Sequence, residues 1–290
     1  MKDHNIGVLL VVLGALSWAS SGVMAESLFK KSYSVEWVNL YRLLFSGLFL
    51  AFLSFSPKKI QLFTNMKEFF SLLCFSVFGL LLAQFAYFKA IFYIDAGTAT
   101  MIQYSAPLFI MLFLCVRNKI LPRKIDIFAL ILLVVALFFL AFKGEFSLEK
   151  LNFWGFFWGI LGAFGVVYYS LGARGIIQKY GVVFVLAWAS LVDTGVLWVL
   201  VGGEIPSYAF NLIDYGTMLG IIFVGTILAF SLYLKGLERV GALRASMIAC
   251  IEPVAAAVMT CVLLGTKYSW LDIAGFVLIL FAVFLNTRAK

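Results

Sequence analysis

The sequence predicts an all-α integral membrane protein with ten transmembrane helices in two inverted five-helix repeats. Three observations predict this fold class: the composition, a succession of long apolar runs, and an internal repeat. Of the 290 residues, 64% are hydrophobic and 12% are charged, whereas soluble domains are about half apolar and about a quarter charged. Because a soluble fold of this size has too little interior to bury so many apolar side chains, lipid must cover much of the surface.

Ten apolar runs follow one another along the chain, each about as long as a helix that crosses the bilayer. We expect the first five at 6–26, 34–56, 69–93, 96–116 and 125–142, and the second five at 153–173, 182–201, 212–235, 241–264 and 270–287. The first run lacks a basic segment before it and a small-residue cleavage site, so we expect a retained helix rather than a signal peptide.

The basic residues indicate the topology. With ten spans, fifteen of the 22 Lys and Arg residues fall on the side of the two termini, six fall on the opposite side, and Arg42 alone lies within a span. Basic loops stay on the cytoplasmic side, so we expect both termini in the cytoplasm and the protein in the cell (inner) membrane. The net charge of +8 is then a topology signal, and we expect no nucleic-acid partner.

An internal repeat relates the two halves of the chain. Residues 79–138 align without a gap on residues 225–284, 146 positions later, with 17 identities in 60 positions. The matched pairs include Tyr87 with Tyr233, Lys89 with Lys235, Pro107 with Pro253, and Asp126 with Asp272. Matched polar residues and prolines are harder to explain by shared apolar bias than matched aliphatic residues are, so the pattern indicates duplication.

The repeat leads to a function class. Each half, 1–145 and 146–290, holds an odd number of predicted spans, so the halves cross the membrane in opposite senses within one membrane domain. Inverted repeats are the usual construction of secondary transporters, in which two similar bundles move around a site near the middle of the membrane. The sequence therefore predicts transport of a small solute by alternating access.

Five polar side chains lie deep within the predicted spans: Arg42, Gln84, Gln103, Asp193 and Glu252. A charged group at the centre of a span costs about 3 kcal/mol, so each is expected to face a cavity or a partner. Glu252 has two interpretations, a site for a substrate ammonium group or a proton, and a structural hydrogen bond to a neighbouring helix. Asp193 is either a proton relay or a partner for a basic group such as Arg42, for which a structural role is favoured.

Two prolines stand at equivalent places in the repeat. Pro107 and Pro253 each remove a helix hydrogen bond, so the helix is expected to bend there and present polar backbone to a cavity. The acid comes before the proline only in the second half, where Glu252 stands in the place of Ala106.

Aromatic residues within the spans are the other candidates for binding. A cavity lined by Trp and Tyr can hold the apolar body of a metabolite or a cation over a ring face, although packing and interfacial anchoring are alternatives for each ring. Together with the polar residues, they give the predicted substrate-binding set of Trp18, Gln84, Tyr87, Gln103, Tyr104, Tyr168, Tyr169 and Glu252.

Metal and enzyme chemistry are not expected. The only histidine is His4, before the first span, and the four cysteines lie within apolar runs. No two-histidine metal motif or paired catalytic acids are present. We therefore expect no metal, no cofactor, no catalytic residue and no enzymatic activity.

Over essentially its whole length the chain resembles the EamA-type transporters of the drug/metabolite transporter superfamily. The motifs that carry the resemblance are Gly14-Ala15-x-x-Trp18, Arg42, Tyr-x-Lys-Ala/Gly at 87–90 and 233–236, Pro107 and Glu252-Pro253. The resemblance implies a central cavity formed mainly by spans 1, 3, 4, 6, 8 and 9, with spans 5 and 10 peripheral. A Gly-Glu pair common in the family is replaced here by Lys119-Ile120 and Gly265-Thr266.

The resemblance also implies a class of substrate, since members of the family commonly export amino acids or other metabolites. We therefore expect a secondary transporter that exports an amino acid or amine-like metabolite, with proton coupling as one possibility and a monomer or a dimer as the assembly. Two alternatives stay open: a transporter of lipid-linked or nucleotide-sugar substrates, and a membrane receptor or structural subunit that transports nothing.

Overall fold

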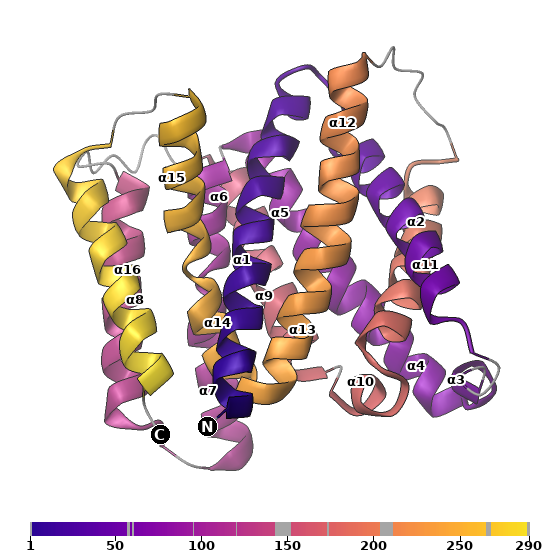
Figure 1. Cartoon of the computed structure of the whole chain (residues 1–290), viewed down its shortest axis with the longest axis horizontal. Coiled ribbons are helices and arrows are strands. Elements are labelled where there is room, and N and C mark those ends of the chain that lie inside the picture. The colour runs from indigo at the N-terminus through magenta and orange to yellow at the C-terminus, as the bar shows by residue number, and fades with distance from the viewer. Residues whose placement is uncertain are drawn as a thin grey trace.

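The computed structural model describes the chain except residues 1, 57, 58, 60, 95, 120, 143–151, 173, 204–210, 265–267, 289 and 290. The described part contains helices and short connections and no β-strand. Most of the long helices run across the molecule between two edges, and the N- and C-terminal ends lie at the same edge (Figure 1). Residues Ile120, Gly265 and Thr266, which stand where related transporters have a Gly-Glu pair, lie outside the described residues.

The helices of the first half are α1 (Lys2–Phe29), α2 (Val35–Ser54), α3 (Gln61–Thr64), α4 (Met66–Cys74), η2 (Phe75–Leu81), α5 (Leu82–Tyr93), α6 (Ala96–Gln103), α7 (Ala106–Asn118) and α8 (Lys124–Phe142). Those of the second half are α9 (Phe153–Gly172), α10 (Arg174–Tyr180), α11 (Val182–Leu200), α12 (Leu212–Gly220), η4 (Ile221–Leu228), α13 (Ala229–Val240), α14 (Ala242–Ala249), α15 (Glu252–Leu264) and α16 (Trp270–Arg288). The segments η2 and η4 are wider π-helical turns within otherwise continuous helices.

Seven helical segments of the described residues are long and apolar enough to cross a membrane. They coincide with seven of the ten predicted spans. The remaining three predicted spans correspond to the pair α6 and α7, to α8, and to α16, which are not among these seven segments. The membrane character and the helical class are thus confirmed, and the count of ten spans stays a prediction.

Helix boundaries recur along the chain at the spacing of the sequence repeat. The helices α12, η4, α14, α15 and α16 each begin 146 residues after α4, η2, α6, α7 and α8. Even the π-helical turn returns at the equivalent place, although hydropathy alone does not distinguish it from α-helix. Such turns frequently mark functional sites, and both of these lie next to the cavity described below.

Each half packs its first helix against the third span of the other half. In one contact α1 lies along α13, and in the other α9 lies along α5. Glycines make the approach close: a Cβ atom on Gly14 would lie 3.0 Å from the backbone oxygen of Ala229, and one on Gly165 would lie 2.4 Å from the backbone nitrogen of Ala83. Small residues at helix contacts are the usual means of association in membranes.

Two similar polar clusters connect the halves at opposite edges. In the first, which we call the Asp214 clasp, the Asp214 carboxylate in the first turn of α12 accepts hydrogen bonds from Lys31 Nζ at 2.5 Å and from Tyr33 Oη at 2.9 Å. In the second, the Glu68 clasp, the carboxylate in the first turn of α4 accepts from Lys179 Nζ at 2.6 Å and from Tyr180 Oη. Each acid lies on one half and its Lys and Tyr on the other.

The two clasps lie at opposite edges of the molecule because α4 and α12, whose first turns carry the two acids, begin at opposite edges. In Figure 1, α4 and α10 are at the edge of the termini, whereas α12 begins at the far edge. Asn65 and Asn211 cap the two helices by accepting hydrogen bonds from backbone N–H groups of the first turn. The hydrogen bond to Glu68 raises the pKa of Lys179, so on the alkaline side the clasp persists through neutral pH and is lost as the pH rises through that raised pKa.

The clasps are expected to contribute unequally to stability. The Asp214 side chain is 4% exposed and that of Glu68 is 22% exposed, and a buried carboxylate depends more on its partners than an exposed one does. We expect Asp214→Ala to lower the thermal unfolding midpoint in detergent more than Glu68→Ala does. Glu26→Ala, which breaks the exposed i,i+4 pair with Lys30, is the control and should change the midpoint least. The opposite order would contradict this assignment.

Candidate functional site

A cavity lies between the two halves, lined by residues of α1, α2, α5, α6, α7, α9, η4, α13, α14 and α15. These helices belong to predicted spans 1, 3, 4, 6, 8 and 9, with span 2 in addition. The cavity has a volume of about 60 Å³, which is room for about four to six water molecules. The helices α8 and α16 pack against each other away from it, at one flank of the molecule (Figure 1).

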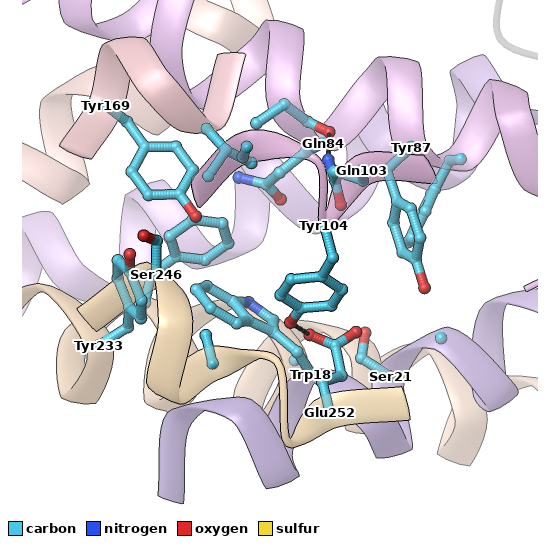
Figure 2. A pocket seen from close by; sticks show the side chains of 18 of the residues that line it. Trp18, Ser21, Gln84, Tyr87, Gln103, Tyr104, Tyr169, Tyr233, Ser246 and Glu252 are labelled. Atoms are coloured by element: carbon cyan, nitrogen blue, oxygen red, sulfur yellow. Dashed lines mark hydrogen bonds between the residues drawn. The ribbon is translucent and has the colours of Figure 1, made fainter. Parts of the chain in front are cut away.

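Two interrupted helices meet at this cavity. The chain turns between α6 and α7 and again between α14 and α15, immediately before the segments that carry Pro107 and Pro253. Tyr104, in the first interruption, donates a hydrogen bond of 2.5 Å to Oε2 of Glu252, which begins the helix after the second (Figure 2). Equivalent places in the two halves are thus joined directly across the cavity by a phenol and a carboxyl group.

Aromatic rings form much of the wall. The Trp18 ring centroid lies 4.8 Å from that of Phe230 and 5.0 Å from that of Tyr233, and Tyr169 meets Tyr233 edge-on at 5.7 Å. In Figure 2, Tyr169 and Tyr233 lie on one side of the view and Tyr87 on the other, with Trp18, Tyr104 and Glu252 between them. This wall suits a ligand with an apolar body or a cationic group.

Other polar groups of the cavity differ in how they are bonded. The Gln103 amide donates to the backbone oxygen of Ala83 at 2.9 Å, and the Tyr87 hydroxyl shares a hydrogen bond of 2.7 Å with Thr100. Among the described residues, neither amide atom of Gln84 has a hydrogen-bond partner, and the side chain is buried. The cavity therefore combines polar groups fixed by the fold with others that the fold leaves unbonded.

Arg42 and Asp193 do not form the ion pair considered for them. Within the described part of the chain, no carboxylate lies within ion-pair distance of Arg42, and its guanidinium instead lies 4.2 Å from the ring centroid of Phe88. Asp193 bonds to the hydroxyl of Ser76 through Oδ1, while Oδ2 has no partner. Arg42 lines the cavity and Asp193 does not, so the two buried charges occupy different environments although they belong to equivalent spans.

Most of the predicted site residues come together in this cavity. It is lined by Trp18, Arg42, Gln84, Tyr87, Gln103, Tyr104, Pro107, Tyr169 and Glu252. The structure does not place Tyr168 with them: its side chain is 37% exposed and its ring meets that of Phe78. Consecutive residues point about 100° apart around a helix, and here Tyr169 is the one of the two tyrosines that faces the cavity.

Several lining residues were not predicted. Phe230, Ser246 and Ser21 are too common in apolar spans to stand out in a sequence. Tyr233 could have been found, because it is the repeat partner of the predicted Tyr87. Within the described residues, no group of three or more His, Cys, Asp or Glu side chains is placed to hold a metal ion.

The comparisons with known proteins identify the family. The model of the EamA-like transporter family matches the chain twice, over residues 5–142 and 153–288. Together the two matches cover nearly the whole sequence. The chain belongs to the EamA-like transporter family.

Relatives of this EamA-like protein are also named as transporters. It is 31% identical to "Uncharacterized inner membrane transporter YicL" of Salmonella typhimurium, over 98% of this chain and 96% of that protein. It is 23% identical to "Uncharacterized transporter YcbK" of Bacillus subtilis, over 95% of this chain and 90% of the relative. The family and these relatives support a membrane transporter with a small-molecule substrate.

A solved structure shares the fold of this EamA-like chain. A crystal structure aligns with a TM-score of 0.72 over 99% of each chain, at 15% sequence identity. At this identity the likeness shows the fold alone. The overall arrangement of the chain is thus a known one, whereas the chemistry of the cavity has to be read from this sequence.

Proposed function

We propose that this protein is a secondary active transporter that exports a small amino acid or amine-like metabolite across the inner membrane by alternating access. The observation that carries the proposal is the hydrogen bond between Tyr104 and Glu252, which joins two equivalent helix interruptions across a small cavity. Discontinuous helices that meet near the middle of the membrane are where transporters of inverted-repeat construction bind their substrates and coupling ions.

The topology that we propose is ten spans in two inverted repeats, 1–145 and 146–290, with both termini in the cytoplasm. It is supported by the recurrence of helix starts at 146 residues and by two separate matches of one family model. The common edge of the termini in Figure 1 and the excess of basic residues on that side are consistent with it. Under this topology the Glu68 clasp faces the cytoplasm and the Asp214 clasp the opposite side.

For coupling, we propose that Glu252 binds a proton in one state of the transport cycle and the ammonium group of the substrate in the other. Its side chain is 6% exposed and lines the cavity, so a change in its charge acts directly on whatever is bound. Asp193 is the second candidate for a proton relay, but its position outside the cavity favours a structural role. The alternative cargo of lipid-linked or nucleotide-sugar type is disfavoured by the small size of the cavity.

Flux into proteoliposomes tests the proposed function. Purified protein in vesicles with an imposed pH gradient is expected to accumulate at least one radiolabelled amino acid or amine, and to lose the accumulation when the gradient is collapsed by an ionophore. Protein-free vesicles are the control. Absence of flux for every solute in a panel of amino acids, amines and nucleotide sugars would reject transport and leave a receptor or structural role.

A further inference from the structure

We propose that Arg42 and Gln84 form a carboxylate-binding subsite in the cavity, so that the solute recognised by this protein carries a carboxylate group. The inference rests on the proposed function, and it narrows the proposed cargo from an amino acid or amine-like metabolite to one that bears a carboxylate. It is carried by two buried polar side chains of the cavity wall whose hydrogen-bonding groups the protein itself leaves unused.

Arg42 presents an unused edge of its guanidinium group. The side chain, on α2, lines the cavity and is 3% exposed, and neither Nε nor Nη2 has a hydrogen-bond partner within the part of the chain that the structure describes. These two nitrogens lie on the same edge of the planar group, and their N–H bonds point in parallel. That edge is the one that receives both oxygens of a carboxylate side by side.

Gln84 adds a second polar group to the same cavity. It is 5% exposed, lines the cavity, and among the described residues has no hydrogen-bond partner for either amide atom. It lies four residues before Phe88 on α5, on one face of that helix, and the Phe88 ring is the surface on which the Arg42 guanidinium rests at 4.2 Å. Because buried polar groups are nearly always hydrogen-bonded, two side chains that line one cavity with four unbonded atoms between them point to a ligand that bonds them.

The charge of Arg42 also lacks a direct counter-ion. Asp193 acts on it electrostatically, but no ion pair joins them, and the Oδ1 atom of Asp193 is engaged by Ser76 on η2. Because Asp193 does not line the cavity, it does not occupy the space in which an anion could reach the arginine. A carboxylate bound there would be planar, bidentate and charge-neutralising, whereas a phosphate would need more donors than this pair supplies.

The rest of the cavity limits what else the ligand carries. Glu252, with its hydroxyl partner Tyr104, places an acid in the same small space. A ligand with a carboxylate at Arg42 and an ammonium group toward Glu252 would meet a complementary charge at each polar position. A small zwitterion fits this arrangement better than a simple amine, which leaves Arg42 unpaired.

Binding to the purified full-length protein tests the subsite. The probes are the twenty amino acids, acetate and succinate, and each amino acid that raises the thermal unfolding midpoint is compared with its carboxamide and its decarboxylated amine by titration calorimetry. We expect carboxylates to bind and their matched amides and amines to bind at least about tenfold more weakly, because charged hydrogen bonds are lost.

Variants assign the effect to the two residues. Arg42→Lys keeps the charge but removes the two parallel N–H groups of the guanidinium edge, and Gln84→Leu removes the amide. Each substitution is expected to weaken carboxylate binding by about tenfold or more. Because Arg42→Gln alone leaves Asp193 without an opposite charge, the double variant Arg42→Gln/Asp193→Asn removes both charges and preserves the fold. It should unfold cooperatively and bind no carboxylate, while Asp193→Asn alone should still bind.

The outcomes separate this inference from the proposed function. Carboxylate binding that depends on Arg42, without flux in vesicles, would support the subsite and reject transport. The subsite would be overturned if amines were bound or transported as well as the amino acids from which they derive. It would also be overturned if carboxylates bound with unchanged affinity to Arg42→Lys and to the double variant. A panel in which no carboxylate binds would overturn it too.

Discussion

Glu252→Gln is expected to abolish proton-driven accumulation of substrate while exchange of substrate across the membrane continues. Gln keeps the size of the side chain and can still accept the hydrogen bond from Tyr104, but it cannot take up or release a proton. With one proton coupled to each substrate molecule, a gradient of one pH unit sustains about a tenfold concentration ratio, and this ratio should fall to unity in the variant. The measurement is uptake of labelled substrate into proteoliposomes with and without the gradient.

A matched acid outside the cavity controls for loss of charge. Glu26, which pairs with Lys30 near the end of α1, does not line the cavity, so Glu26→Gln should leave the accumulation ratio unchanged. If Glu252→Gln still accumulates substrate to the wild-type ratio, Glu252 does not carry the coupled proton. The same assay on Asp193→Asn would then decide whether the second buried acid does.

Among the described glycines that do not line the cavity, Gly165 is the one at which substitution by alanine is expected to destabilise the protein most. The added Cβ would lie 2.4 Å from the backbone nitrogen and 2.7 Å from the Cα of Ala83 on α5. Backbone atoms of a packed helix cannot rotate away as a side chain does, so α9 and α5 would have to separate. Overpacking in cores costs about 1–3 kcal/mol, and we expect this substitution at the upper end of that range or beyond.

The control for this prediction is another helical glycine. Gly195 on α11 has no atom within 4 Å of the position that a Cβ would take, and replacing an unconstrained helix glycine with alanine gains about 0.5–1 kcal/mol. Thermal unfolding in detergent should therefore show opposite shifts for Gly165→Ala and Gly195→Ala. A Gly165→Ala protein as stable as the wild type would mean that the contact between α9 and α5 is looser than the structure has it.

Much of the candidate site could be predicted because polar residues are rare within apolar spans. Gln84, Gln103 and Glu252 stand out there for an energetic reason: each needs a partner or a cavity, and all three line the cavity. Arg42 stands out equally, but the sequence could not indicate whether its partner is internal. The prediction favoured a structural role for it, and only the positions of the surrounding atoms revealed two unbonded nitrogens on one edge.

The parts of the fold that escaped prediction depend on geometry that hydropathy does not record. The π-helical turns η2 and η4 look like any apolar stretch, because the hydrogen-bond register does not alter composition. The acids of the two clasps look like ordinary loop charges, although Asn65-x-x-Glu68 and Asn211-x-x-Asp214 carry the same helix-capping pattern at equivalent places of the repeat. Comparing the loops of the halves, as well as their spans, would have revealed them.

Each clasp joins residues that are synthesised far apart in time. Lys31 emerges from the ribosome 183 residues before its partner Asp214, and Glu68 emerges 112 residues before Tyr180. At typical elongation rates of about 5–20 residues per second, the first interval lasts roughly 10 to 40 s. From the synthesis of Glu68 until that of Lys179, both Lys31 and Glu68 lack their partners in the second half, and α1 lacks α13, the helix against which it packs. The vulnerable species in this protein's assembly is therefore the half-made chain, and protection by insertion factors would matter most before the second half is complete.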